Sequence, residues 1–247
     1  MERAGIGLHG GAPVRARLLP APPGSGIRFR TSSGEVEADL RHATPEPGAT
    51  VLRAGEAVVR TPEHLLAALA ALGVWDVLVE LEGDELPALD GSAAGWVEAI
   101  DEAGRVTTGP LDPRVPERSR RFEADGAATL GPGGTIGVDV AYDDGPVGVL
   151  EVPATEEAFR REVAWARTFV LARDVPRLLA TGRGRGASEA NTVVWPTSEL
   201  RAPDEPVRHK LLDAWGDLAL AGPIRARWFV ERGHHVLHVR ALREALS

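Results

Sequence analysis

The stretch Pro206–Leu218 reads Pro-Val-Arg-His-Lys-Leu-Leu-Asp-Ala-Trp-Gly-Asp-Leu and has the pattern of a helix. On a helix, His209 and Asp213 share one face, and Asp217 extends that face by one more turn. An imidazole and a carboxylate one turn apart can form half of a site for zinc or another divalent first-row metal. The same spacing also occurs in solvated surface pairs, so spacing alone leaves both interpretations open.

Lys210, next to His209, strengthens the interpretation that this helix face belongs to a functional site. It is the only lysine in the chain, where arginine is used at every comparable position. A lysine ammonium is a compact charge on a flexible stem, whereas a guanidinium is a planar fork, so the two are not interchangeable in a crowded polar site. Its position beside His209 favours a polar site over the chance survival of one surface lysine.

Composition and charge exclude several classes of function and of active site. The 247 residues allow one large domain or two small ones, and the net charge of -8 argues against nonspecific binding to nucleic acid. The absence of cysteine excludes disulfides, thiolate zinc sites and a cysteine nucleophile. The chain has neither a signal-peptide pattern nor an apolar run near the roughly 18 residues that span a membrane. We therefore expect a soluble, cytoplasmic protein without a transmembrane segment.

The first half of the chain begins with short strands and continues with two helices. The predicted strands are 5–9, 14–19, 26–30, 34–39, 50–52, 57–59 and 75–81. Thr61 is a suitable N-cap, and Pro62 a suitable first-turn residue, for a helix that ends at Gly73. Ser92 is a suitable cap for a second helix at 93–103.

The second half repeats this order after a linker. Gly109–Glu117 contains three prolines, and we place the boundary between two domains, 1–112 and 118–247, in this segment. The predicted strands are 121–122, 128–130, 135–140, 147–152 and 225–230, and the predicted helices are 155–163, 174–181, 207–221 and 235–246.

A weak internal similarity suggests duplication. Residues 64–72 can be aligned with 210–218, and four positions are identical. Helices rich in leucine and alanine also resemble one another by composition, so the similarity has two explanations. Two copies of a sheet-plus-helices unit would bring the polar helix ends, Glu63-His64 and His209-Lys210, together across an interface.

Glu63 and His64 can supply the other half of a metal site. Adjacent helical residues point about 100° apart, so one can bind a metal while the other acts beside it. Zinc hydrolases combine a few ligands with a nearby carboxylate that accepts a proton from water, which assigns His64 as ligand and Glu63 as general base. With His209 and Asp213, the ligand set is His-His-Asp and leaves a fourth position open for water.

The stretch Arg232–His235 places two further imidazoles on a turn after a strand. One of them could protonate a leaving amine or stabilise an oxyanion, and Asp217 could orient it or keep it protonated. His42 and His238 have no comparable neighbours in the sequence, and we interpret them as surface or turn residues.

Five motifs occur in order along the chain, at Gly5–His9, Thr61–Leu65, Leu89–Ala93, Ala166–Phe169 and Val207–Leu218. They resemble, in the same order, Gly-Val-Gly-Leu-His, Thr-Val-Glu-His-Leu, Asp-Gly-Ser-Ala, Ala-Arg-Thr-Phe and a metal-helix signature. These are the motifs of the zinc-dependent UDP-3-O-acyl-N-acetylglucosamine deacetylases of lipid A synthesis. The match covers nearly the whole chain.

The resemblance implies an α+β fold of two tandem βα two-layer sandwich domains related by duplication, with the active site at their interface. It implies a Zn²⁺ cofactor on His64, His209 and Asp213, with Glu63 as the base.

The resemblance also implies roles for residues around this cluster. Thr168 would donate a hydrogen bond to the oxyanion, and Lys210 would lie near the sugar and phosphates of the substrate. Arg232 and Phe169 are further expected substrate contacts, since a basic residue precedes the family's last motif and the apolar stretch from Phe169 could line an acyl passage.

A catalytic histidine near the C-terminus, held by Asp217, is the last implied residue. We assign it as His234, because Arg232-Gly233-His234 keeps the basic residue and the Gly-His pair of the family's Gly-His-x-Leu-Asn pattern. The Leu-Asn of the pattern is replaced, so His235 is the alternative.

We therefore predict a zinc amidohydrolase that removes the N-acetyl group from UDP-3-O-acyl-N-acetylglucosamine, the committed step of lipid A synthesis. We expect a monomer whose partner is this small molecule. The segment after Phe169 includes Arg183 and Arg185, so a deacetylase for another N-acetylated nucleotide sugar, without a long acyl chain, is an alternative. A non-catalytic ligand-binding homologue is another, against which the retained Glu63 argues.

Overall fold

The computed structural model describes residues 1–247, and its first half is built around one five-stranded sheet. The strand order is β1-β2-β7-β3-β4. Only β7 and β3 run parallel, and every other neighbouring pair is antiparallel. The strands are β1 (Glu2–Ile6), β2 (Pro13–Pro20), β3 (Ile27–Thr31), β4 (Gly34–Glu37) and β7 (Val77–Glu82).

The second half contains a sheet with the same topology. Its order, β8-β9-β14-β10-β11, again has one parallel pair, β14 and β10, at the corresponding position. The strands are β8 (Arg120–Glu123), β9 (Ala127–Gly131), β10 (Thr135–Ala141), β11 (Val147–Pro153) and β14 (Arg227–Glu231). The repeated order and directions agree with the duplication that the sequence suggests.

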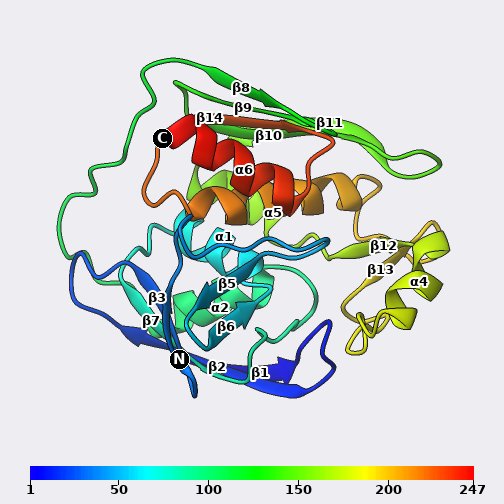
Figure 1. The fold of residues 1–247 in the computed structure, drawn as a ribbon, viewed down its shortest axis with the longest axis horizontal. Coiled ribbons are helices and arrows are strands. Elements are labelled where there is room, and N and C mark those ends of the chain that lie inside the picture. The colour runs from blue at the N-terminus through cyan, green and yellow to red at the C-terminus, as the bar shows by residue number, and fades with distance from the viewer.

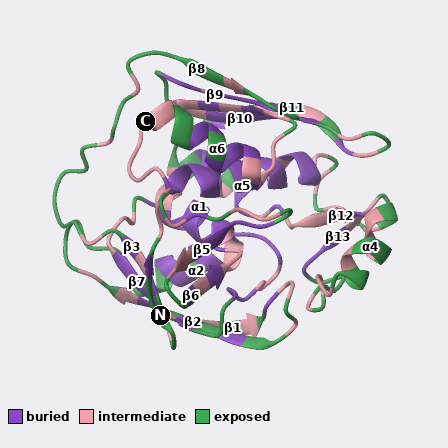
Figure 2. Ribbon diagram, in the orientation of Figure 1, coloured by how far each residue is buried: buried purple, intermediate pink, exposed green.

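Two helices accompany each sheet at matching places in the chain. In the first half α1 (Glu63–Ala71) precedes β7 and α2 (Ala94–Ala103) follows it, and in the second half α5 (Glu205–Ala219) precedes β14 and α6 (His235–Leu246) follows it. The helices lie between the two sheets, with α1 facing α5 (Figure 1). Buried residues are concentrated in this middle region (Figure 2).

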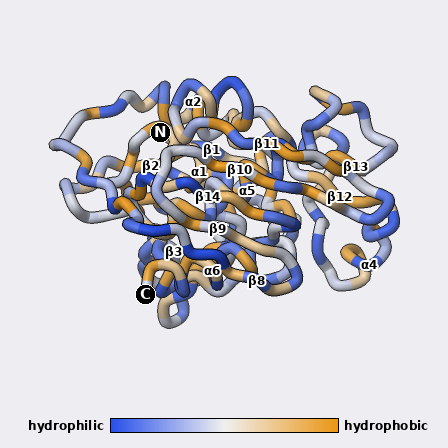
Figure 3. Tube along the Cα trace, turned by 90° about the horizontal axis from the view of Figure 1, so that it is seen from above, coloured by the Kyte–Doolittle hydropathy of each residue, from blue (hydrophilic) through white to orange (hydrophobic).

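Each half carries an insertion before its first helix. In the first half it is the hairpin of β5 (Val51–Ala54) and β6 (Ala57–Arg60). In the second half a longer insertion begins with a turn packed against α5 and continues as an arm beside the helices, in which the parallel strands β12 and β13 are apolar (Figures 1 and 3). Its elements are α3 (Glu156–Ala158), the π-helical turn η1 (Phe159–Val163), β12 (Phe169–Leu171), the 3-10 turn η2 (Ala172–Asp174), α4 (Val175–Ala180) and β13 (Val193–Trp195).

The structure confirms the predicted two-domain α+β sandwich and corrects several local details. The first strand ends at Ile6 rather than at His9, and the helix predicted over 155–163 is an α-turn followed by a π-turn. Thr61 is not an N-cap, because its backbone is left-handed (φ 53°) and Pro62 occupies the capping position. The segment between α2 and β8 contains no helix or strand, and the domain limits within it stay a prediction. None of the helices combines the length and apolar character needed to cross a membrane.

Candidate active site

The facing helices α1 and α5 bring the predicted metal ligands together. The Nε2 atom of His209 lies 3.4 Å from Oδ1 of Asp213, and Nε2 of His64 lies 3.9 Å from the same oxygen. The two imidazole rings meet edge to face, with their centroids 5.0 Å apart. One possible ligand atom from each residue falls within a cluster in which all atoms lie within 4.8 Å of one another.

The chemistry of this cluster fits a divalent metal with nitrogen and oxygen ligands. The Nδ1 atom of His209 lies 3.1 Å from the carbonyl oxygen of Ala166, so it can donate there and leave Nε2 free for the metal. Burial, followed by the neighbouring His209, lowers the pKa of His64 to about 3, and burial lowers the pKa of His209. Both imidazoles are therefore neutral, which is the form that binds a metal.

Lys210 lies against the carboxylate of this cluster. Its buried Nζ donates to Oδ2 of Asp213 at 2.9 Å. Burial opposes ionisation of Asp213, but the Lys210 ammonium beside it holds its pKa well below the usual range. Asp213 is consequently ionised, with Oδ1 toward the imidazoles and Oδ2 toward the ammonium.

Glu63 is a buried carboxylate beside the cluster. The residue is 4% exposed, and its Oε2 atom has no hydrogen-bond partner. Burial raises the pKa of Glu63 to about 8, and a cation bound beside it would oppose this shift and favour the ionised base. Burying a carboxylate oxygen without a partner costs free energy unless a charged or polar group contacts it. The orphaned oxygen therefore fits a place where a cation and a reacting water are bound.

His235 completes this group of buried polar side chains. Its Nδ1 lies 2.7 Å from Oδ2 of Asp217, and its Nε2 lies 4.0 Å from both Oε1 of Glu63 and Oδ2 of Asp213. Burial alone would lower the pKa of His235, but the Asp217 carboxylate outweighs it and raises the pKa to about 9. The imidazole is therefore a cation with one N–H directed toward Glu63 and Asp213.

The prediction that Asp217 holds His234 is wrong. His234 lies at the surface, where its Nε2 is 2.9 Å from Oδ1 of Asp125, and its Nδ1 accepts the Leu237 N–H as the N-cap of α6. The helix begins one residue later, which turns His235 inward. Leu237 could have identified this register, because aligning it with the leucine of Gly-His-x-Leu-Asn makes His235 the histidine of the pattern.

His238 is the residue that the sequence reasoning missed. It was interpreted as a surface or turn residue, but it is fully buried, and its Nδ1 lies 2.7 Å from Oδ2 of Asp217. The Thr50 hydroxyl donates to Oδ1 of the same carboxylate at 2.6 Å. The available signal was the spacing of His235 and His238, which places both on one side of α6.

The other predicted residues lie on two separate segments, and Phe169 contacts a residue of the cluster directly. The ring centroid of Phe169 lies 6.2 Å from that of His209. The backbone N–H of Thr168 donates to the carbonyl oxygen of Gly91 at 2.8 Å, which joins the two halves of the molecule. Arg232 has a left-handed backbone (φ 49°) at the turn between β14 and α6. The structure places these residues, while their contacts with a substrate stay predictions.

Two sandwich domains, with a His-His-Asp cluster and a buried carboxylate between their facing helices, fit a metal-dependent hydrolase. The profile of one family, described as UDP-3-O-acyl N-acetylglycosamine deacetylase, matches residues 1–247, and the chain belongs to this family. The resemblance seen in the sequence is thereby confirmed.

Relatives in three species support this membership. The chain is 39% identical to the UDP-3-O-acyl-N-acetylglucosamine deacetylases of Brucella melitensis, Brucella ovis and Brucella abortus. Each alignment is 262 positions long, gaps included. The alignments cover 99% of this chain and 92% of each relative. The similarity therefore includes both domains and the helices that carry the site.

Proposed function

We propose that this protein removes the N-acetyl group from UDP-3-O-acyl-N-acetylglucosamine and uses a zinc ion held by His64, His209 and Asp213. The observation that carries the proposal is the buried His-His-Asp cluster next to the unpartnered carboxylate oxygen of Glu63. A ligand set of two imidazoles and one carboxylate leaves a position for water, as catalytic zinc sites do.

The protein groups divide the proton transfers among themselves. Zinc, when bound, supplies a Lewis acid and lowers the pKa of water to about 7. Glu63 takes a proton from water as the water oxygen bonds to the acetyl carbonyl carbon. The His235 imidazolium and the Thr168 hydroxyl donate hydrogen bonds to the carbonyl oxygen as negative charge develops on it. The C–N bond then breaks, the amine takes the proton from Glu63, and the acetic acid formed loses the second proton of the water and leaves as acetate.

The remaining site residues bind the substrate in this proposal. Lys210 and Arg232 are cations suited to the phosphates, and Phe169 lies on the apolar β12 strand of the arm, where an acyl chain could bind. We place the reaction in the cytoplasm, where nucleotide sugars are found. Because one chain supplies every residue of the site, the protein can act as a monomer.

The decisive test compares zinc-loaded wild-type protein with the Glu63→Gln variant. We expect wild type to release acetate from the acylated substrate, and the variant to lose about 100-fold or more in kcat because glutamine cannot accept the proton. Substrate binding should change little. Unaltered turnover by the variant would contradict the mechanism.

The same assay decides the substrate class. We expect the 3-O-acylated nucleotide sugar to have a higher kcat/KM than UDP-N-acetylglucosamine, since the apolar strands of the arm can contact an acyl chain. Preference for the unacylated sugar would contradict this assignment. Zinc binding without turnover of either compound would identify the chain as a binding protein.

A further inference from the structure

Arg167 and Glu205 form a buried ion pair at the edge of the site. The Nε and Nη2 atoms of Arg167 donate to Oε1 and Oε2 of Glu205 at 2.8 and 3.0 Å, and the Glu205 side chain is 0% exposed. The carboxylate also accepts the backbone N–H groups of Arg167 and Arg201, at 3.1 and 2.7 Å. Two parallel charge-assisted hydrogen bonds fix both distance and orientation.

This pair joins two segments that meet at the candidate metal cluster. Glu205 is the first residue of α5 and lies one turn before His209. Arg167 follows Ala166, whose carbonyl oxygen faces Nδ1 of His209, and precedes Thr168. The ion pair therefore connects the helix that carries two predicted ligands to the short segment that orients one of them.

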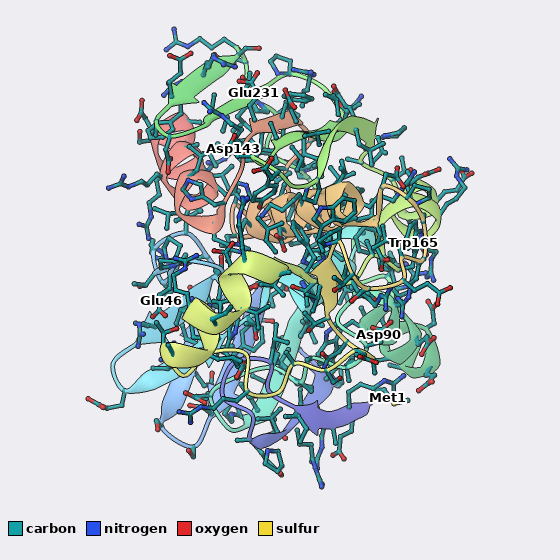
Figure 4. All side chains as sticks on the ribbon, turned by 90° about the vertical axis from the view of Figure 1, so that its right-hand side faces the viewer. Met1, Glu46, Asp90, Asp143, Trp165 and Glu231 are labelled. Carbon is teal, nitrogen blue, oxygen red and sulfur yellow. The ribbon has the colours of Figure 1, made fainter.

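The same segment is also anchored to the first half of the molecule. The Nη1 atom of Arg201 donates to Oδ2 of Asp90 at 3.0 Å and to the carbonyl oxygen of Trp165 at 2.6 Å. Asp90 and Trp165 lie on the same edge of the molecule (Figure 4). The backbone N–H of Thr168 donates to the carbonyl oxygen of Gly91. Both flanks of residue 167 are thus held, and its side-chain ion pair links it to the first turn of α5.

We propose that the Arg167–Glu205 pair is a positioning device that holds the Ala166 carbonyl against His209 and so controls how tightly the metal is bound. Neither side chain contacts the reacting atoms. Groups that orient a metal-ligating histidine commonly change metal affinity about 10- to 100-fold when they are removed. The inference rests on the proposed function only in taking His64, His209 and Asp213 as metal ligands.

The test measures metal binding, and it requires no turnover. Apo protein is titrated with Zn²⁺ in competition with a chelator, and the absorption spectrum of the Co²⁺-loaded protein is recorded. We expect Arg167→Ala to weaken zinc binding about 10-fold or more and to change the Co²⁺ spectrum. Arg167→Lys keeps the charge but cannot form two parallel bonds, so we expect an intermediate affinity.

Arg160→Ala is the matched control. Arg160 donates to both oxygens of Asp101 at 2.7 Å, and none of its side-chain hydrogen bonds goes to α5 or to residues 166–168. We expect it to keep the wild-type affinity and spectrum. Wild-type behaviour of Arg167→Ala, or an equal loss in Arg160→Ala, would overturn the inference. If Arg167→Ala does not fold, Arg167→Lys decides: weakened binding supports the inference, and wild-type binding overturns it.

The two proposals can fail separately. If wild type binds zinc but does not deacetylate the substrate, the proposed function fails while the comparison of variants remains valid. If wild type binds zinc and turns over substrate, and the Arg167 variants bind zinc equally well, the positioning role alone is overturned.

Discussion

Asp217 accepts hydrogen bonds from three side chains, and this crowding restricts the rotation of His235. Both Nδ1 atoms of His235 and His238 lie 2.7 Å from Oδ2, while the Thr50 hydroxyl donates to Oδ1. A carboxylate held in this way cannot turn without breaking other bonds. His235 is therefore fixed with its Nε2 toward Glu63, which is the orientation that the proposed oxyanion contact requires.

The two adjacent histidines give a residue-scale prediction. His235→Gln should lower kcat about 100-fold, because the neutral amide cannot supply a cationic donor at the carbonyl oxygen. His234→Gln should stay within about twofold of wild type, because that side chain contacts Asp125 at the surface. Steady-state kcat and KM values check this. Similar losses in both variants would refute the assignment of His235.

At this scale the sequence predicted that His64, His209 and Asp213 lie together, but it placed His234 rather than His235 against Asp217. His209 and Asp213 are four residues apart on one helix, so local geometry alone makes them neighbours. The choice between His234 and His235 depends on where α6 begins, and the role of His238 depends on Asp217 in another helix. Sequence spacing does not contain tertiary contacts of this kind.

The crossing of α1 and α5 is the central feature at the scale of elements. A Cβ atom at Gly216 would lie 2.1 Å from the backbone oxygen of Glu63, far closer than atoms can approach. Glycine at this position thus lets the two helix backbones touch. The distance between the helices in turn sets the distance between the ligand on α1 and the ligands on α5.

Gly216→Ala should consequently destabilise the protein and disturb the site. Alanine normally stabilises a helix by about 1 kcal/mol relative to glycine, but forcing these backbones apart should cost about 2 kcal/mol overall. Gly95→Ala in α2 is the control, because its new Cβ would meet side-chain atoms of Leu89 and no backbone, and the nearest of them, Cδ1 at 2.9 Å, can move aside. Denaturant unfolding measures both. A variant at 216 as stable as wild type would contradict the role of the crossing.

Most elements were predictable because their signals are local. Residue alternation indicated the sheet strands, and apolar periodicity indicated α1, α2, α5 and α6 to within a few residues. The cap at Thr61 was predicted wrongly because a left-handed residue there turns the chain into α1, and propensity does not indicate such a turn. The arm strands β12 and β13 are three residues each, too short for a periodic pattern.

At the scale of the whole molecule, the two halves share one site. His64 comes from the first sandwich, and His209 and Asp213 come from the second, so neither half contains a complete cluster. A metal held by both halves links them directly. Its binding free energy therefore adds to the stability of the assembled domains and not to that of either alone.

Metal removal should lower the thermal stability of the whole protein. At a free zinc concentration 100 times the Kd, the metal stabilises the folded state by about 2.7 kcal/mol, which chelation removes. Calorimetry should show a Tm that falls with a chelator and recovers when zinc is added. His64→Ala should show a much smaller zinc-dependent shift. An identical Tm with and without metal would exclude a shared ligand set.

Lys210 is the only lysine and lies 2.9 Å from the carboxylate of Asp213. Isotopic labelling of lysine would therefore produce one side-chain resonance, and that resonance would come from the centre of the site. Its chemical shift could follow metal loading and substrate binding without any engineered probe. Because the chain contains no other lysine, this one side chain would report directly on the centre of the proposed site.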